Sequence, residues 1–170
     1  VYPRPVQKPN PPIFVMVSQN DSTVINAAKE GFSIFFGGLP NDETLRKLNL
    51  YKQTALEAGY LEEEVRQMVE RSGKLLFVYV AETDELAIEE YREGVEWYVS
   101  VRDSRPTFGV IIRDRNVDYP KFIQSENTIV GSPETAVERI RKFQRETGMN
   151  NIICWMNVGG QPQKNVLKSM

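Results

Sequence analysis

The sequence alternates unbroken apolar runs with amphipathic segments, and this alternation constrains the fold more than any other feature. The runs are continuous in hydrophobicity, which is typical of strands buried on both faces of a parallel sheet. They cover residues 13–17, 32–36, 75–80 and 151–156. A helical segment follows each run, so the order predicts four βα units, arranged either as a doubly wound sheet or as part of a (β/α)8 barrel.

The helices are predicted from apolar spacing and from residues that cap helix ends. Asp21 or Ser22 is expected to cap the first helix, and Ser132 followed by Pro133 to start a later one. Residues 102–131 are less regular, with a short extra strand expected at 108–112. The expected helices cover residues 22–30, 42–59, 61–71, 83–101 and 133–147, and a last short helix passes through Val166 and Leu167.

The chain is long enough for one domain but short for a complete barrel. It has 170 residues, whereas a (β/α)8 barrel typically needs roughly 250. Five of the first twelve residues are proline, so 1–12 is expected to be a lead-in and 13–170 a single domain. The sequence starts with Val1 and no secretory signal precedes the first strand. We therefore expect an internal start.

Composition removes several functional classes. The net charge of −2 argues against a nucleic-acid binder driven by bulk charge, and no apolar run is long enough to span a membrane. The single cysteine, Cys154, lies in an apolar run and is interpreted as a core side chain. It cannot form an internal disulfide, which favours a reducing, cytoplasmic location. With no histidine, a Ser-His-Asp triad is excluded and no metal site is expected.

The most informative candidate site follows the first strand. Ligands of parallel α/β proteins bind at the carboxyl ends of the strands, and here small polar residues lead into a helix. Free backbone N–H groups at such a helix start attract phosphate, although plain helix capping would use the same residue types. Gly37 and Gly38 follow the second strand, where they would either admit a flat ring or form an ordinary turn. The polar residues are Ser18, Gln19, Asn20, Ser22 and Thr23.

Four segments together resemble the luciferase-like flavin monooxygenases. The proline-rich stretch 2–13 resembles the lead-in to the family's fifth strand, and Val-Tyr-Val-Ala-Glu-Thr-Asp-Glu at 78–85 its seventh strand. Ile-Val-Gly-Ser-Pro-Glu at 129–134 is similar to the start of the seventh helix, and 151–170 to the eighth strand and its helix. The resemblance implies an α/β fold of the TIM-barrel type, with this chain supplying strands five to eight.

The resemblance also implies a cofactor and a site. Family members bind reduced FMN, or a deazaflavin in some cases, and most use O2 to oxidise a small organic substrate. By position, Gln19, Asn20 and Thr23 would hold the flavin phosphate, with Ser18 and Ser22 adjacent. The ring would lie against Val17, Phe36, Gly37 and Gly38. The family's catalytic histidine, reactive cysteine and phosphate-binding arginine belong to the first four strands, so the catalytic residues of this chain stay unassigned.

The expected partners follow from the same resemblance. A flavin reductase would supply the reduced cofactor, and dimers are frequent in the family. A half barrel has two open sheet edges, so we expect an N-terminal half or a partner chain to complete it. Two other functions remain open: a non-catalytic flavin-binding or structural subunit, and a deazaflavin-dependent oxidoreductase on the same fold.

Overall fold

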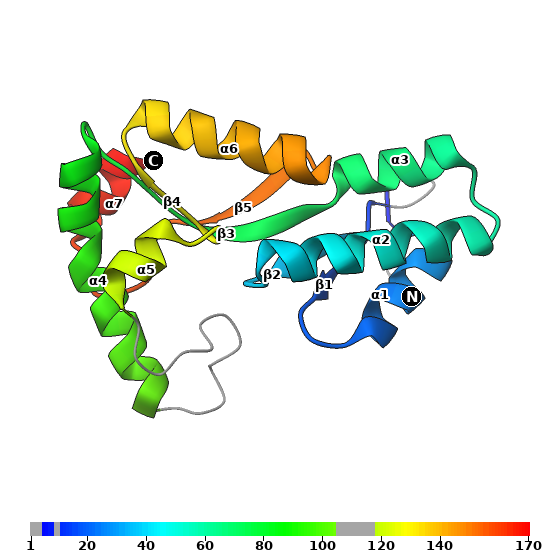
Figure 1. Cartoon of the computed structure of the whole chain (residues 1–170), viewed down its shortest axis with the longest axis horizontal. Coiled ribbons are helices and arrows are strands. Elements are labelled where there is room, and N and C mark those ends of the chain that lie inside the picture. Colours follow the sequence, from blue (N-terminus) through cyan, green and yellow to red (C-terminus); the bar gives the residue numbers. More distant parts are fainter. Residues whose placement is uncertain (1–4, 9–10, 105–117) are drawn as a thin grey trace.

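The computed structural model describes residues 5–8, 11–104 and 118–170 and shows an α/β fold with a parallel sheet (Figure 1). The strands are β1 (Phe14–Val17), β2 (Ser33–Gly37), β3 (Gly73–Val80), β4 (Thr128–Gly131) and β5 (Asn151–Trp155). The helices are α1 (Asp21–Lys29), α2 (Asn41–Glu57), α3 (Glu62–Arg71), α4 (Asp84–Ser104), α5 (Tyr119–Gln124), α6 (Pro133–Thr147) and α7 (Gln163–Ser169).

Strand β3 is the centre of the sheet. Its first half pairs with β2 on one edge and with β5 on the other, so that Leu75 lies opposite both Gly37 and Ile153. Its second half pairs with β4, with Val78 opposite Ile129. Strand β1 extends the sheet beyond β2. The four predicted strands are therefore present as parallel partners.

Strand β4 and helix α5 were not predicted. Both lie within residues 102–131, where the sequence pattern is irregular, and the resemblance places the start of a helix at residues 129–134. Residues 132–134 do form the start of α6, where the Ser132 side chain accepts a hydrogen bond from the N–H of Thr135. Ile129 and Val130 instead form a strand, because the second half of β3 offers them a free edge beyond the end of β2. The extra strand expected at 108–112 lies outside the described residues.

The core is divided among three apolar clusters. One fills the space between β1, β2 and helices α1–α3. Along β3 the side chains alternate: Leu76 and Val78 pack toward α6, whereas Phe77 and Tyr79 pack toward α4 and α5. Both faces of the second half of β3 are thus covered by helices, which explains its continuous apolar sequence.

The outer strands are less well covered. In the described part of the chain, β1 pairs with β2 and β5 with β3, and neither has a strand at its other edge. Phe14 is 43% exposed, Met16 53% and Ile153 37%. Cys154, interpreted from the sequence as a core side chain, is exposed on β5. That interpretation was wrong because β5 lies at the edge of the sheet.

Candidate functional site

The carboxyl ends of β1 and β2 bring the two predicted site segments together. The strands pair in parallel with Val17 opposite Phe36, so residues 18–23 and 37–38 leave the sheet side by side. A Cβ atom built on Gly37 would lie 3.9 Å from the carbonyl oxygen of Val17. Gly38 has a φ of +54°, a backbone conformation that favours glycine. The two segments therefore form one continuous surface.

Among the residues that the structure describes, no side chain caps the backbone N–H groups in the first turn of α1. Its N-cap residue is Asn20, not Asp21 or Ser22 as predicted, because the helix begins at Asp21. The Asn20 side chain makes no capping hydrogen bond with the described residues. Asn20 and Ser22 are exposed, and Ser18 and Thr23 are half-buried. Uncapped N–H groups beside small polar side chains can donate hydrogen bonds to an anion from solvent, so the local chemistry fits a phosphate group.

Two of the predicted ring contacts face away from this surface. The side chains of Val17 and Phe36 are fully buried in the cluster under α1–α3. A ligand at the strand ends can reach these two residues through backbone atoms. Gly37 is buried within the sheet, and Gly38 is half-buried at its end. The glycines thus offer the closer approach for a ring.

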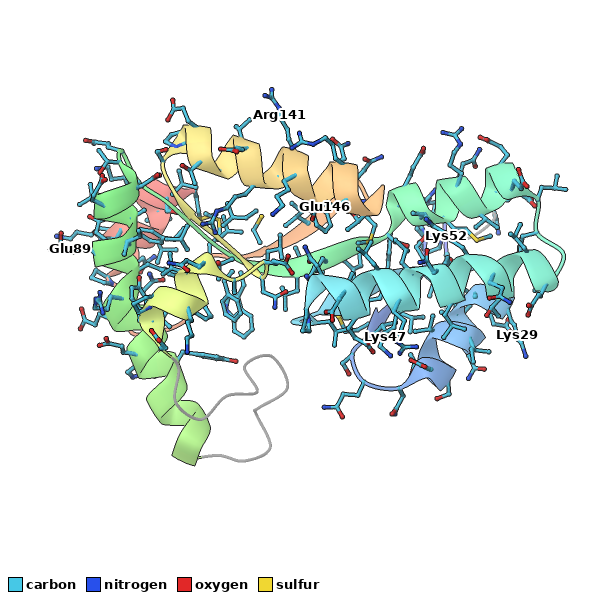
Figure 2. The ribbon with its side chains drawn as sticks, viewed as in Figure 1. Lys29, Lys47, Lys52, Glu89, Arg141 and Glu146 are labelled. Carbon is cyan, nitrogen blue, oxygen red and sulfur yellow. The ribbon has the colours of Figure 1, made fainter. Side chains whose placement is uncertain are left out.

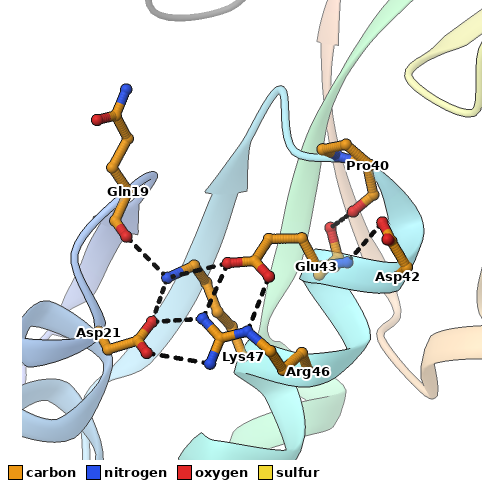
Figure 3. Close-up of polar contacts among 8 residues, drawn as sticks. Gln19, Asp21, Pro40, Asp42, Glu43, Arg46 and Lys47 are labelled. Atoms are coloured by element: carbon orange, nitrogen blue, oxygen red, sulfur yellow. Dashed lines mark hydrogen bonds and ion pairs between the residues drawn. The ribbon is translucent and has the colours of Figure 1, made fainter.

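A network of four charged side chains ties the start of α1 to α2 (Figure 3). Arg46 binds Asp21 in a bidentate manner, with N–O distances of 2.7 and 3.0 Å, and also Glu43, at 2.8 and 2.9 Å. Lys47 bonds to Asp21, to the carbonyl oxygen of Gln19 at 3.0 Å, and lies 3.5 Å from Glu43. The hydrogen bonds from Arg46, and then that from Lys47, hold the pKa of the Asp21 carboxyl well below its usual range. The carboxylate of Asp21 is therefore turned toward α2.

A second buried lysine lies on β3, next to the start of α2. Lys74 is fully buried and donates to the Asn41 side chain at 2.8 Å. Asn41 in turn donates its backbone N–H to Glu126 at 3.1 Å and its amide to Glu146 at 3.2 Å. Burial lowers the pKa of Lys74 to about 8, although the two glutamates act in the opposite direction.

A cavity of about 380 Å³ borders this second network. Asn41, Glu126 and Glu146 line it, together with Arg139 and other residues of α6. Figure 2 shows Glu146 on α6 facing the start of α2. None of the predicted site residues lines this cavity, so it is separate from the strand-end surface. No group of three His, Cys, Asp or Glu side chains in the described ranges is arranged to hold a metal ion.

Neither buried lysine was anticipated from the sequence. Lysine is almost never fully buried unless it is paired; Lys47 follows the charged residues Glu43 and Arg46, and Lys74 directly precedes the apolar run 75–80 and was not counted as part of it. Spacing alone could have placed Lys47 on the buried side of α2, because it lies three residues after Thr44 and four before Tyr51, both buried.

Among the described residues, no helix combines the length and apolarity that crossing a bilayer requires.

Comparisons with known proteins give a consistent result. Residues 1–151 match the family described as luciferase-like monooxygenase. No curated protein matches the sequence. The chain is similar in structure to the monooxygenase RslO1 from Streptomyces bottropensis, with a TM-score of 0.72 and 20% identity over 99% of this chain and 47% of that one.

Two further solved structures share the fold. One is the oxygenating constituent of 3,6-diketocamphane monooxygenase from Pseudomonas putida, solved in complex with FMN, with a TM-score of 0.62, 20% identity and coverage of 85% and 42%. The other is the coenzyme F420 dependent tetrahydromethanopterin reductase from Methanopyrus kandleri, with a TM-score of 0.60, 14% identity and coverage of 91% and 48%. The chain spans about half the length of these proteins.

Proposed function

Because this chain belongs to the luciferase-like monooxygenase family, we propose that it forms part of the flavin site of an oxidoreductase that uses reduced FMN and O2 to oxidise a small organic substrate. The observation that carries the proposal is the uncapped first turn of α1 at the adjoining ends of β1 and β2. In parallel α/β proteins this end of the sheet binds ligands. When bound, reduced flavin would supply the electrons that O2 accepts.

The proposed phosphate contacts are the backbone N–H groups of the first turn and the small polar side chains around them. The helix end carries roughly half a positive charge, which favours an anion. The side chains are Ser18, Gln19, Asn20, Ser22 and Thr23. Arg46 and Lys47 are already bound to Asp21 and Glu43, so in this proposal further cationic charge for the phosphate comes from elsewhere in the protein.

The isoalloxazine ring is proposed to lie beyond the phosphate, against Gly37 and Gly38. Both glycines let the ring approach the backbone closely, and the backbone of Val17 and Phe36 adjoins the same position. The described residues at the strand ends supply binding groups, and we assign no catalytic acid or base among them. The catalytic groups are proposed to come from the rest of the barrel.

We propose that an N-terminal half or a partner chain completes that barrel. The partly exposed apolar side chains Phe14, Met16 and Ile153 support this, because such side chains are normally covered in a closed sheet. The chain length relative to the compared structures supports it as well. A flavin reductase and a second copy of the protein are further proposed partners, suggested by the family alone.

A deazaflavin-dependent oxidoreductase is the second candidate. It is favoured by the similarity in fold to the coenzyme F420 dependent reductase. A direct comparison of FMN and a deazaflavin cofactor in binding assays distinguishes the two: the preferred cofactor should bind the wild-type protein at least about tenfold more tightly.

The test of the phosphate site is a fluorescence-quenching titration of FMN with the intact protein. The double variant Asn20→Ala/Thr23→Ala should weaken FMN binding by at least about tenfold, because two hydrogen bonds to a charged group are lost. Asn26→Ala is the matched control, since Asn26 is exposed on the same helix beyond the first turn. Equal affinities for all three proteins would reject the proposed site.

A further inference from the structure

The side chain of Lys47 leaves α2 and ends at the segment between β1 and α1. It is completely buried, although it is a lysine on a helix whose neighbouring Arg46 is half-exposed. Figures 2 and 3 show it pointing from α2 toward the start of α1. An ammonium group has three hydrogens to donate, and three acceptors surround it: the Gln19 carbonyl, Asp21 and Glu43.

The bond to the Gln19 carbonyl fixes the orientation of a peptide group in the proposed phosphate-binding segment. A trans peptide is planar, with its C=O and N–H pointing in opposite directions. Because the Gln19 carbonyl points at Lys47, 3.0 Å away, the N–H of Asn20 must point away from α2. Residues 18–20 belong to no helix or strand, so this contact is a main constraint on that peptide.

The same ammonium acts with Arg46 on the charge at the helix start. Asp21 is the first residue of α1, where its carboxylate would compete with a bound anion for the N–H groups. Lys47 and Arg46 hold that carboxylate against α2 instead. Two cations and two carboxylates make the cluster neutral, so the segment meets an anion without repulsion from Asp21.

We infer that Lys47 is a positioning residue, which holds residues 19–21 in the conformation that receives the flavin phosphate without touching the phosphate itself. The inference rests on the proposed phosphate site at α1. It predicts that replacing Lys47 weakens the contribution of the phosphate and leaves the contribution of the ring unchanged. Riboflavin has the ring but lacks the phosphate, so the ratio of FMN to riboflavin affinity measures the effect directly.

The experiment compares oxidised FMN and riboflavin binding to the intact wild-type protein and to Lys47→Met. We expect the variant to lose about tenfold in FMN affinity, with riboflavin affinity unchanged within about twofold. Lys74→Met is the matched control, because Lys74 is equally buried but contacts Asn41 instead of the segment before α1. This control should retain the wild-type preference for FMN.

Each other outcome overturns a specific claim. A wild-type protein that binds riboflavin as tightly as FMN rejects the phosphate site itself. A Lys47→Met protein that retains the FMN preference, or that loses both ligands equally, rejects the positioning role, as does an equal loss of preference in Lys74→Met. If Lys47→Met does not fold, Asp21→Asn/Glu43→Gln/Lys47→Met removes the unpaired carboxylates as well, and the same selective loss is expected.

Discussion

Two fully buried lysines, Lys47 on α2 and Lys74 on β3, lie near the N-terminal half of α2 in opposite electrostatic settings. Lys47 lies between α2 and the start of α1 and contacts two carboxylates and a carbonyl. Lys74 lies between β3 and the start of α2 and contacts the neutral side chain of Asn41. Its nearest carboxylates, Glu126 and Glu146, bind to Asn41.

The difference shows that burial alone does not determine the structural role of a charged side chain. Around Lys47 the counter-charges are in direct contact, so the ammonium can serve as a fixed cross-link between two segments. Around Lys74 they lie beyond an intervening amide, so desolvation dominates and lowers its pKa to about 8. The first arrangement suits a segment that must hold one conformation, whereas the second leads us to expect a pH-dependent contribution of Lys74 to stability.

The largest expected effect comes from removing the charges that compensate Lys47. Asp21→Asn/Glu43→Gln retains oxygen acceptors but leaves a buried ammonium without a counter-ion. Breaking a buried pair in this way should lower the free energy of unfolding by about 3 kcal/mol. Urea denaturation at neutral pH measures it.

A rescue variant separates charge from packing in that experiment. Adding Lys47→Met to the same background removes the unpaired ammonium and should restore most of the lost stability. A loss below about 1 kcal/mol in the double variant, or no recovery in the triple, would show that the contacts of Lys47 contribute little to stability.

These two lysines also mark the limit of what the sequence could predict. The strands β1, β2, β3 and β5 follow from continuous apolar runs, and the start of α6 from Ser132 and Pro133. Spacing can place Lys47 on the buried side of α2, but no local pattern identifies the acceptors of either lysine, because they come from another segment: the carbonyl of Gln19 and the amide of Asn41 are set by how α2 packs.

Strand β4 escaped prediction for a related reason. Its four residues contain a single apolar pair, Ile129 and Val130, and they form a strand because β3 extends beyond β2 and offers an edge.

For the candidate site, the sequence placed residues 18–23 and 37–38 at strand ends, where the structure has them. It could not reveal that Val17 and Phe36 turn into the core, since that depends on which face of the sheet the helices cover.

The pH dependence of the free energy of unfolding tests the electrostatic setting of Lys74. Its pKa is lower in the folded protein than in the unfolded chain, whose lysines titrate near 10.5. Above about pH 8 the unfolded state therefore binds more protons than the folded state, and stability rises with pH. The wild-type protein should gain about 2 kcal/mol relative to Lys74→Met between pH 7 and 10.

Chemical denaturation of both proteins across that pH range provides the measurement. Tyrosines such as Tyr51, whose pKa burial raises to about 12, remain in both proteins, so the difference between them isolates Lys74. Parallel pH profiles would mean that Lys74 keeps its ordinary pKa in the folded protein.

A smaller effect is expected at the amide that separates Lys74 from the glutamates. Asn41→Ala removes the acceptor of Lys74 and the donor to Glu146, and should cost about 1.5 kcal/mol at pH 7. The loss should shrink near pH 10, where Lys74 is neutral and needs its acceptor less. Asn49→Ala, at an exposed position of the same helix, is the control and should change stability by less than about 0.5 kcal/mol.

The smallest effect is expected at Arg46, despite its four hydrogen bonds to Asp21 and Glu43. Its side chain is 50% exposed, so water solvates the guanidinium whenever the pairs open, and salt screens them. Arg46→Gln should cost less than about 1 kcal/mol, no more than Arg66→Gln, which breaks comparable exposed pairs on α3. A loss as large as that of Asp21→Asn/Glu43→Gln would instead make the guanidinium, rather than the buried ammonium, the group that fixes α1 to α2. The positioning role would then pass from Lys47 to Arg46, and the FMN-to-riboflavin ratio of Arg46→Gln would fall with it.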